Sequence, residues 1–161
     1  MPLIKKIEKA MNTLKEGDKA FAFDALDQDN NRHTLADYAG KKLIVFFYPA
    51  ASTPGCTAEA CNLTENYSAL KEAGYAILGV SADSASKQKK FQEKYSFPFP
   101  LLADTQKTVI QGFGVWGEKK FMGRTYDGIH RITFLIDENG LISRVIDKVK
   151  TKDHADQILS Q

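Results

Sequence analysis

Two apolar runs dominate the hydrophobic pattern of the chain. Residues 43–48 read LIVFFY and residues 75–82 read YAILGVSA, and neither run alternates between apolar and polar positions. A strand with one wet face alternates, whereas a strand covered on both faces reads as a continuous apolar run. We therefore expect both segments to be central strands of a covered sheet.

Helical periodicity occupies the stretches that follow these strands. Apolar residues after the first strand recur at intervals of 4, 3, 4 and 3: Cys56, Ala60, Leu63, Tyr67 and Leu70. This spacing predicts a helix that begins near Pro54 and ends at Gly74, a suitable C-terminal cap. After the second strand, Ser84 is placed to cap a more polar helix that runs to Tyr95.

The next part of the chain alternates less regularly. Residues 97–104, FPFPLLAD, carry two prolines and suit an edge strand or a loop, and a weaker helix is expected over residues 105–112. Residues 112–128 are rich in glycine, and we expect them to be irregular.

The C-terminal part contains the clearest hairpin signal. Residues 131–147, RITFLIDENGLISRVID, are two apolar strands around Asn139-Gly140, a pair that favours a type I′ turn. A last helix is expected over Lys152 to Leu159.

The N-terminal part predicts two further elements. Leu3, Ile7, Ala10 and Leu14 lie three or four residues apart, which indicates an amphipathic helix over residues 1–15. A small hairpin is then indicated by the alternation in AFAFDAL, followed by a polar turn and RHTL.

The order of these elements predicts the fold class. Strand, helix, strand, helix, antiparallel hairpin and helix make an α/β thioredoxin-like fold, with a mixed central sheet and helices on both faces. We expect residues 1–161 to form a single domain, with residues 1–15 as a helical N-terminal extension before the small hairpin. Fold alone does not assign a function.

Charge and hydropathy exclude several classes of partner. The chain has 22 Lys and Arg against 20 Asp and Glu, a net charge of +2, which argues against nucleic-acid and membrane-surface binding. The longest uncharged stretch, residues 43–58, is interrupted by prolines and is too short to span a membrane. The N-terminus lacks the apolar core of a secretory signal, so we expect a cytoplasmic protein.

The two cysteines are the candidates for chemistry. If Thr53 is the N-cap and Pro54 the first helical residue, Cys56 lies at the third position. The positive end of a helix favours a thiolate there, so we interpret Cys56 as a nucleophile. An ordinary thiol is about 3% ionised at pH 7, so full ionisation gives only about a 30-fold gain, and other groups must stabilise the transition state.

Cys61 lies five residues beyond Cys56. In an intact helix the two Cα atoms are roughly 9 Å apart, whereas a disulfide needs about 7 Å or less. A disulfide between them therefore requires the helix to unwind. The alternative is that both cysteines are structural. Zinc binding is disfavoured, because C-x4-C does not direct two thiolates at one ion and no histidine shows ligand spacing: His33, His130 and His154.

The sequence around Cys56 resembles that of a known family. Residues 49–61, PAASTPGCTAEAC, are similar to the peroxiredoxin signature P-x3-T-x2-C, in the form of the peroxiredoxin Q or bacterioferritin comigratory group. The resemblance runs from about Leu14 to the C-terminus and includes GVSADS, KYSFPFPLLAD, GVWGEKK and GIHRITFLIDENG. Where that family has Ala-Pro-x-Phe near the N-terminus, this chain reads KAFAF without a proline.

The resemblance implies a thiol peroxidase and a role for each site residue. Cys56 would be the peroxidatic cysteine that becomes a sulfenic acid, and Cys61 the resolving cysteine that forms a disulfide with it. Thr53 would bind the peroxide, Pro49 would shield the thiolate from water, and Arg131 would stabilise the thiolate and polarise the peroxide. Thioredoxin would reduce the disulfide, and no metal, haem or flavin is implied.

Other readings of these residues stay open. The alternatives are that Pro49 simply ends a strand, that Thr53 is only a helix cap and that Arg131 is a solvated residue at a strand start. Trp116 is interpreted as a packing aromatic near the site. A general thiol-disulfide reductase is one alternative function, although it would favour C-x2-C. A non-enzymatic scaffold or iron-linked binding protein is another. For the assembly we expect a monomer, with a dimer as the alternative.

Overall fold

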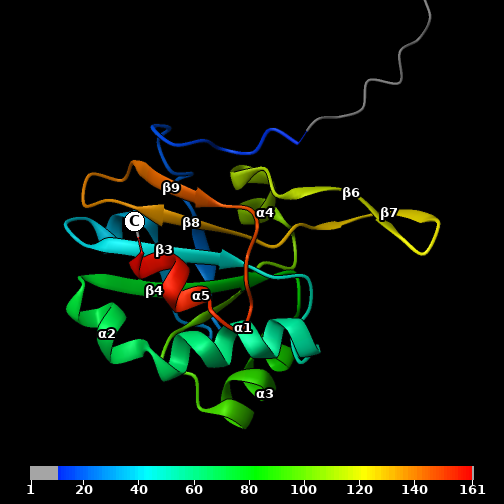
Figure 1. The fold of residues 1–161 in the computed structure, drawn as a ribbon, viewed down its shortest axis with the longest axis horizontal. Helices are drawn as coiled ribbons and strands as arrows, with labels where there is room; N and C mark the ends of the chain where they lie inside the picture. The colour runs from blue at the N-terminus through cyan, green and yellow to red at the C-terminus, as the bar shows by residue number, and fades with distance from the viewer. Residues whose placement is uncertain (1–10, 161) are drawn as a thin grey trace, which may run out of the picture.

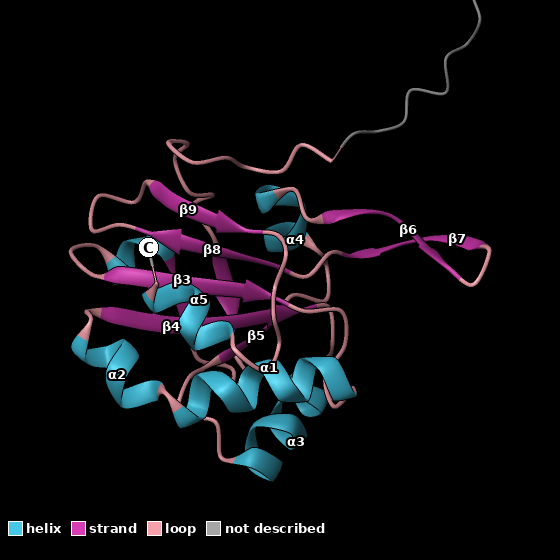
Figure 2. Ribbon diagram, in the orientation of Figure 1, coloured by secondary structure: helices cyan, strands magenta, loops and turns pink. Residues whose placement is uncertain are grey.

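A mixed five-stranded sheet forms the centre of the protein, as seen in a computed structural model (Figures 1 and 2). The central strand β3 (Lys42–Phe47) pairs in parallel with β4 (Tyr75–Ser81) and antiparallel with β8 (Ile132–Ile136). β5 (Leu101–Ala103) and β9 (Ile142–Ile146) are the two edges. The predicted central strands are confirmed, and of the two alternatives for residues 97–104, an edge strand or a loop, the edge strand is observed over Leu101–Ala103.

Helices cover both faces of this sheet, as expected for a thioredoxin-like fold (Figure 1). One face carries α1 (Pro54–Glu65), α2 (Tyr67–Glu72), α3 (Ala85–Tyr95) and α5 (His154–Leu159). The other face carries α4 (Thr108–Phe113) and the short 3-10 helix η1 (Leu35–Tyr38). The predicted fold class is confirmed.

Alternate residues of β3 enter two separate apolar clusters, one on each face. The cluster under α4 takes Leu43, Val45 and Phe47. The cluster under α1, α2, α3 and α5 takes Ile44, Phe46 and Tyr48. Because both faces of β3 are fully buried, the strand needs no polar position, which explains its continuous apolar run.

The helix predicted from Pro54 to Gly74 is two helices. α1 ends at Glu65 and α2 begins at Tyr67, with Asn66 between them. The Asn66 side chain donates to the carbonyl of Asn62 at 2.9 Å, beside the backbone bond of Asn66 to the same oxygen at 3.2 Å. An asparagine side chain that competes for the helix carbonyls favours such a break. The apolar spacing continues through it, so the sequence did not show the interruption.

The region predicted to be irregular contains a hairpin. β6 (Trp116–Phe121) and β7 (Arg124–Ile129) pair antiparallel and project from the body of the protein (Figure 2). Met122 and Gly123 turn the chain with positive φ angles of 50° and 77°. Most side chains of both strands are exposed or half-buried, so no apolar alternation marks them.

Four smaller predictions concern the ends of helices and one turn. Ser84 caps α3 as predicted, accepting a hydrogen bond from the amide of Lys87. The hairpin of β8 and β9 is confirmed, but its turn is not type I′: only Gly140 of the Asn139-Gly140 pair has positive φ. α4 begins at Thr108, later than predicted, because a turn precedes it. The final helix, α5, also begins slightly later.

The structure describes residues 11–160, so most of the predicted N-terminal helix lies outside the described residues. Residues 11–15 carry no helix, and the amide of Leu14 instead donates to the carbonyl of Phe113 at 3.1 Å. The small hairpin that follows is confirmed as β1 (Asp24–Leu26) and β2 (Arg32–Thr34). Phe23 of the KAFAF segment is buried in the core.

Candidate active site

Cys56 lies at the start of α1, directly after the carboxyl end of β3. Thr53 is the N-cap and Pro54 the first helical residue, so the predicted position of Cys56 is confirmed. The thiol is free and only 1% of the residue is exposed. Thr53 does not cap the helix with its side chain, because its hydroxyl donates to the carbonyl of Ala50 at 2.7 Å. That hydroxyl is exposed.

Arg131 approaches Cys56 from the other side of the site. Phe47 pairs with Ile132 in the β3–β8 ladder, so Arg131 precedes β8 at the point where β3 ends. Its Nη2 atom lies 3.2 Å from Sγ of Cys56 and donates to it. A fixed guanidinium is a suitable partner for a thiolate and for the oxygen anion that develops when a peroxide bond breaks. The structure therefore brings these two predicted residues together.

Glu59, one helical turn beyond Cys56, holds the other end of the guanidinium. Nη1 of Arg131 donates to Oε1 of Glu59 at 2.9 Å. Glu59 is fully buried, and burial raises its pKa to about 7 against the opposing pull of Arg131. Burial alone would lower the pKa of Arg131, but Glu59 and Cys56 outweigh it and raise that pKa. The guanidinium is thus a permanent cation held by two side chains of α1.

Sequence reasoning missed Glu59, although a signal was present. The buried positions of α1 are Cys56, Glu59, Ala60 and Leu63, and Glu59 is the charged residue among them. A carboxylate at an inward position of an amphipathic helix needs a partner, which Arg131 supplies.

Lys119 is a second cation that sequence reasoning missed. It lies on β6, and its Nζ donates to the carbonyl of Ile129 at 2.8 Å. Burial lowers its pKa, nearby Arg131 lowers it further, and Cys56 acts in the opposite direction. The thiol therefore lies within the field of two positive side chains.

Cys61 stays separate from Cys56 in this structure. Both thiols are free, and both lie within the unbroken helix α1. Cys61 is half-buried, and burial, followed by the charge of Glu65, raises its pKa. Its neighbour Asn62 fastens α1 to the start of α5: its side chain donates to the carbonyl of Lys152 and accepts from the amide of Ala155, at 2.7 and 2.8 Å.

Pro49 and Trp116 occupy supporting positions. Pro49 is half-buried in the bend between β3 and α1. Trp116 opens β6 and packs against the apolar cluster under α4, with Nζ of Lys107 4.7 Å from the centre of its ring. Packing by Trp116 is therefore confirmed.

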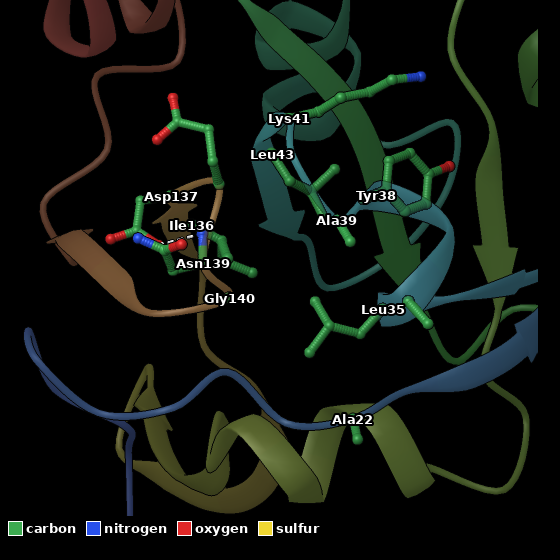
Figure 3. A pocket seen from close by; sticks show the side chains of 12 residues that line it. Ala22, Leu35, Tyr38, Ala39, Lys41, Leu43, Ile136, Asp137, Asn139 and Gly140 are labelled. Carbon is green, nitrogen blue, oxygen red and sulfur yellow. Dashed lines mark hydrogen bonds between the residues drawn. The ribbon is translucent and has the colours of Figure 1, made fainter.

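A separate hollow lies at the opposite end of β3. A pocket of about 320 Å³ is lined by η1, the start of β3 and the β8–β9 turn, including Leu35, Tyr38, Leu43 and Asn139 (Figure 3). Its lining includes none of the site residues above. Within residues 11–160, no group of three or more His, Cys, Asp or Glu side chains is placed to hold a metal, and no helix there could cross a bilayer.

The sequence of this chain is similar to those of known proteins. Residues 16–145 match the AhpC/TSA family. Peroxiredoxin Bcp of Escherichia coli strain K12 is 51% identical over 150 residues, which are 93% of this chain and 96% of that protein. The chain belongs to the peroxiredoxin family. It is a thiol peroxidase of the Bcp and peroxiredoxin Q group, as the resemblance implied.

Solved peroxiredoxins share the fold of this one. Xanthomonas campestris peroxiredoxin Q superposes with a TM-score of 0.83 at 35% identity, covering 91% of this chain and 93% of its own. Peroxidoxin BcpB of Mycobacterium tuberculosis gives 0.81 at 36% identity, covering 91% and 95%.

Proposed function

We propose that Cys56 is the peroxidatic cysteine of this peroxiredoxin and that Arg131 is its catalytic partner. The observation that carries the proposal is the 3.2 Å contact between Nη2 of Arg131 and Sγ of Cys56. The Cys56 thiolate attacks one peroxide oxygen, forms the S–O bond and breaks the O–O bond. The other oxygen leaves as an alkoxide or hydroxide that takes up a proton. Arg131 stabilises the negative charge before and during this step.

Thr53 and Pro49 complete the peroxide site in this proposal. The exposed hydroxyl of Thr53 lies one helical turn before Cys56, where it can contact the incoming peroxide. Pro49 covers the thiolate from the β3–α1 bend and limits its contact with water.

Cys61 is the resolving cysteine in this scheme. Its thiol attacks the sulfenic sulfur of Cys56, forms the S–S bond and releases water. Because both residues lie on α1, the helix must unwind before the two sulfur atoms meet. Thioredoxin then returns both thiols by disulfide exchange, which supplies the two electrons that the peroxide consumed.

The substrate range, compartment and assembly extend from the same chemistry. A structure of the Xanthomonas campestris bacterioferritin comigratory protein, 35% identical, is described in terms of alkyl peroxide reduction activity. We infer that this chain reduces alkyl hydroperoxides as well as hydrogen peroxide. A need for thioredoxin favours the reducing cytoplasm, and an intramolecular disulfide allows a monomer to complete the cycle.

The test is peroxide consumption by the purified protein with thioredoxin and thioredoxin reductase. The wild type should consume hydrogen peroxide and an alkyl hydroperoxide, and Cys56→Ser should consume neither. Arg131→Ala should fold and oxidise more slowly. An unchanged oxidation rate in Arg131→Ala would remove Arg131 from the mechanism, and insulin reduction without peroxide consumption would replace the proposal with a general disulfide reductase.

A further inference from the structure

His154 is a fully buried side chain behind the active site that the proposed mechanism does not use. It is the first residue of α5, and side chains of three elements surround its ring. Nε2 lies 2.8 Å from the hydroxyl of Thr133 on β8, and Nδ1 lies 2.9 Å from Oε1 of Gln157 on α5. The third neighbour is Glu59 of α1, with Oε2 3.6 Å from Nε2.

The hydrogen bonds of Gln157 define which ring nitrogen carries hydrogen. Its Nε2 donates to the carbonyl of Lys148, and its Oε1 accepts from the amide of Lys150. Oε1 is therefore an acceptor toward the ring, so Nδ1 of His154 is the donor. In the neutral ring, Nε2 then carries a lone pair and faces Glu59 and Thr133.

Glu59 presents the complementary requirement. Its Oε1 is bound by Arg131, but its Oε2 is buried and has no hydrogen-bond partner. A separation of 3.6 Å from Nε2 is slightly long for a direct hydrogen bond, but it is close enough for an ion pair. Two lone pairs that face each other repel, whereas one proton on either atom makes the contact attractive. The hydroxyl of Thr133 can rotate to suit both cases.

We propose that His154 is a positioning residue of the peroxidase reaction: it shares one proton with Oε2 of Glu59 and thereby fixes Oε1 on Arg131. The contact holds whether the proton resides on the carboxyl group or on the ring. Arg131 in turn stays against the sulfur of Cys56. This inference rests on the proposed roles of Cys56 and Arg131.

The charges around the pair agree with one proton near neutral pH. Burial lowers the pKa of His154; Gln157 opposes that shift, while Arg131 and Arg144 add to it. Burial raises the pKa of Glu59 to about 7. Two further ionisable groups act at the site: Cys56, which acts on Arg131, and Lys119 on β6, which responds to both of them. Burial disfavours the charged form of both side chains, so one proton held between them, on the carboxyl group or on the ring, suits both.

Two substitutions of His154 test the roles of its two ring nitrogens separately. The amide of His154→Asn reaches the position of Nδ1 and keeps the bond to Gln157, but it is too short to reach Glu59. The longer amide of His154→Gln reaches the position of Nε2 and can donate to or accept from Glu59 in either protonation state. His33→Asn, at a half-buried histidine that bonds Asp27 and Tyr38 in the N-terminal hairpin, is the matched control.

The measurement is the rate constant for oxidation of the reduced protein by hydrogen peroxide between pH 5.5 and 8.5. Stopped-flow fluorescence of Trp116, the single tryptophan, reports the reaction. Thiolate absorbance at each pH corrects for the ionisation of Cys56. We expect His154→Asn to be about tenfold slower than wild type at pH 6, the loss of one hydrogen bond to a charged group. At pH 8.5 it should approach wild type, because Glu59 is then ionised without help.

His154→Gln and His33→Asn should match the wild type within about twofold at every pH. His154→Gln loses only the bond to Gln157, and His33→Asn affects only bonds in the N-terminal part of the chain, so neither removes the proposed contact with Glu59. If His154→Asn matches the wild type at pH 6, or slows equally at all pH values, His154 is only structural and the proposal is wrong. If the wild type itself is not oxidised at Cys56, the proposed function fails instead.

A second measurement does not depend on how the His154 variants fold. The titration of the His154 ring is followed by NMR in the wild type and in Glu59→Gln. A shared proton requires the midpoint to move when Glu59 loses its charge, by about half a pH unit or more. An unchanged midpoint would show that the two side chains do not share a proton and would overturn the proposal.

Discussion

Gly55 faces the guanidinium of Arg131: a methyl group in place of its hydrogen would lie 3.1 Å from Nη2. That separation is tighter than an ordinary contact, so one of the two groups must move. Since Glu59 and Cys56 hold the guanidinium from α1, the space left by Gly55 is part of how the site accommodates Arg131. Gly55, directly before Cys56, therefore leaves room for the Arg131 guanidinium that contacts the thiol.

Gly55→Ala should slow the oxidation of Cys56 by about tenfold, because a shift of a few tenths of an ångström weakens a charge-assisted contact. The stability of the fold should change little, since alanine suits a helix at least as well as glycine. Stopped-flow oxidation and urea unfolding measure the two effects. As a control, Gly55→Ala combined with Arg131→Ala should be no slower than Arg131→Ala alone. Additive losses would mean that the methyl group acts on something other than Arg131.

Glu59→Gln should be more stable than the wild type at high pH. The pKa of Glu59 is raised from 4.5 to about 7. Between these values the folded state keeps a proton that the unfolded state has lost, so stability is full below pH 4.5 and falls as pH rises through 7. Glutamine cannot ionise and avoids this loss, which at pH 8 amounts to about 3 kcal/mol.

Urea unfolding at pH 4.5 and pH 8 tests this difference. The two proteins should be similar at the lower pH and separate at the higher one. The same variant should oxidise more slowly, because Arg131 loses its charged partner. Equal stability of the two proteins at both pH values would show that folding does not raise the pKa of Glu59.

Cys61→Ser should separate oxidation from turnover. Since Arg131 contacts Cys56 and not Cys61, one equivalent of peroxide should oxidise Cys56 at close to the wild-type rate. The sulfenic acid should then persist, because serine cannot form a disulfide. Mass spectrometry with a sulfenic-acid reagent measures the product, and thioredoxin-supported turnover should be lost. Continued turnover would mean that another thiol resolves Cys56.

The disulfide form should be loosened at two places that are distant in sequence. Unwinding α1 to join the two cysteines disturbs Asn62, which holds the amide of Ala155 on α5. Hydrogen exchange should therefore accelerate in α1 and at the start of α5 after peroxide treatment. Cys61→Ser treated in the same way is the control and should retain the slow exchange. Unchanged exchange at Ala155 in the disulfide form would show that α1 rearranges without releasing α5.

Local chemistry explains which parts of the fold the sequence predicted well. A proline one residue after a threonine marks the start of α1, and this fixes Cys56 at its third position. The continuous apolar runs identify the covered strands β3 and β4, because a strand with one face in water would alternate between apolar and polar residues. Arg131 was placed by a family resemblance, and the pairing of β8 with β3 accounts for its position.

The features that were missed have three different causes. β6 and β7 project into solvent, and Met122 at their turn is 86% exposed, so no core imposes a pattern on them. Glu59 occupies an inward position of the helical pattern, but its partner Arg131 lies 72 positions away in the chain. His154 looks like an ordinary surface residue in the sequence, and only tertiary packing buries it. The break at Asn66 rests on one side-chain hydrogen bond, which leaves the helical spacing intact.

The pairing of β8 with β3 also determines the stage of folding at which Cys56 gains its partner Arg131. Cys56 and Arg131 are 75 positions apart in the chain and meet only when these two strands have paired. Before that pairing, Cys56 is an ordinary thiol in an extended chain, without a fixed cation beside it. A nascent polypeptide is therefore protected from its own substrate, and the rate at which peroxide consumes the thiol becomes a measure of how far the molecule has matured.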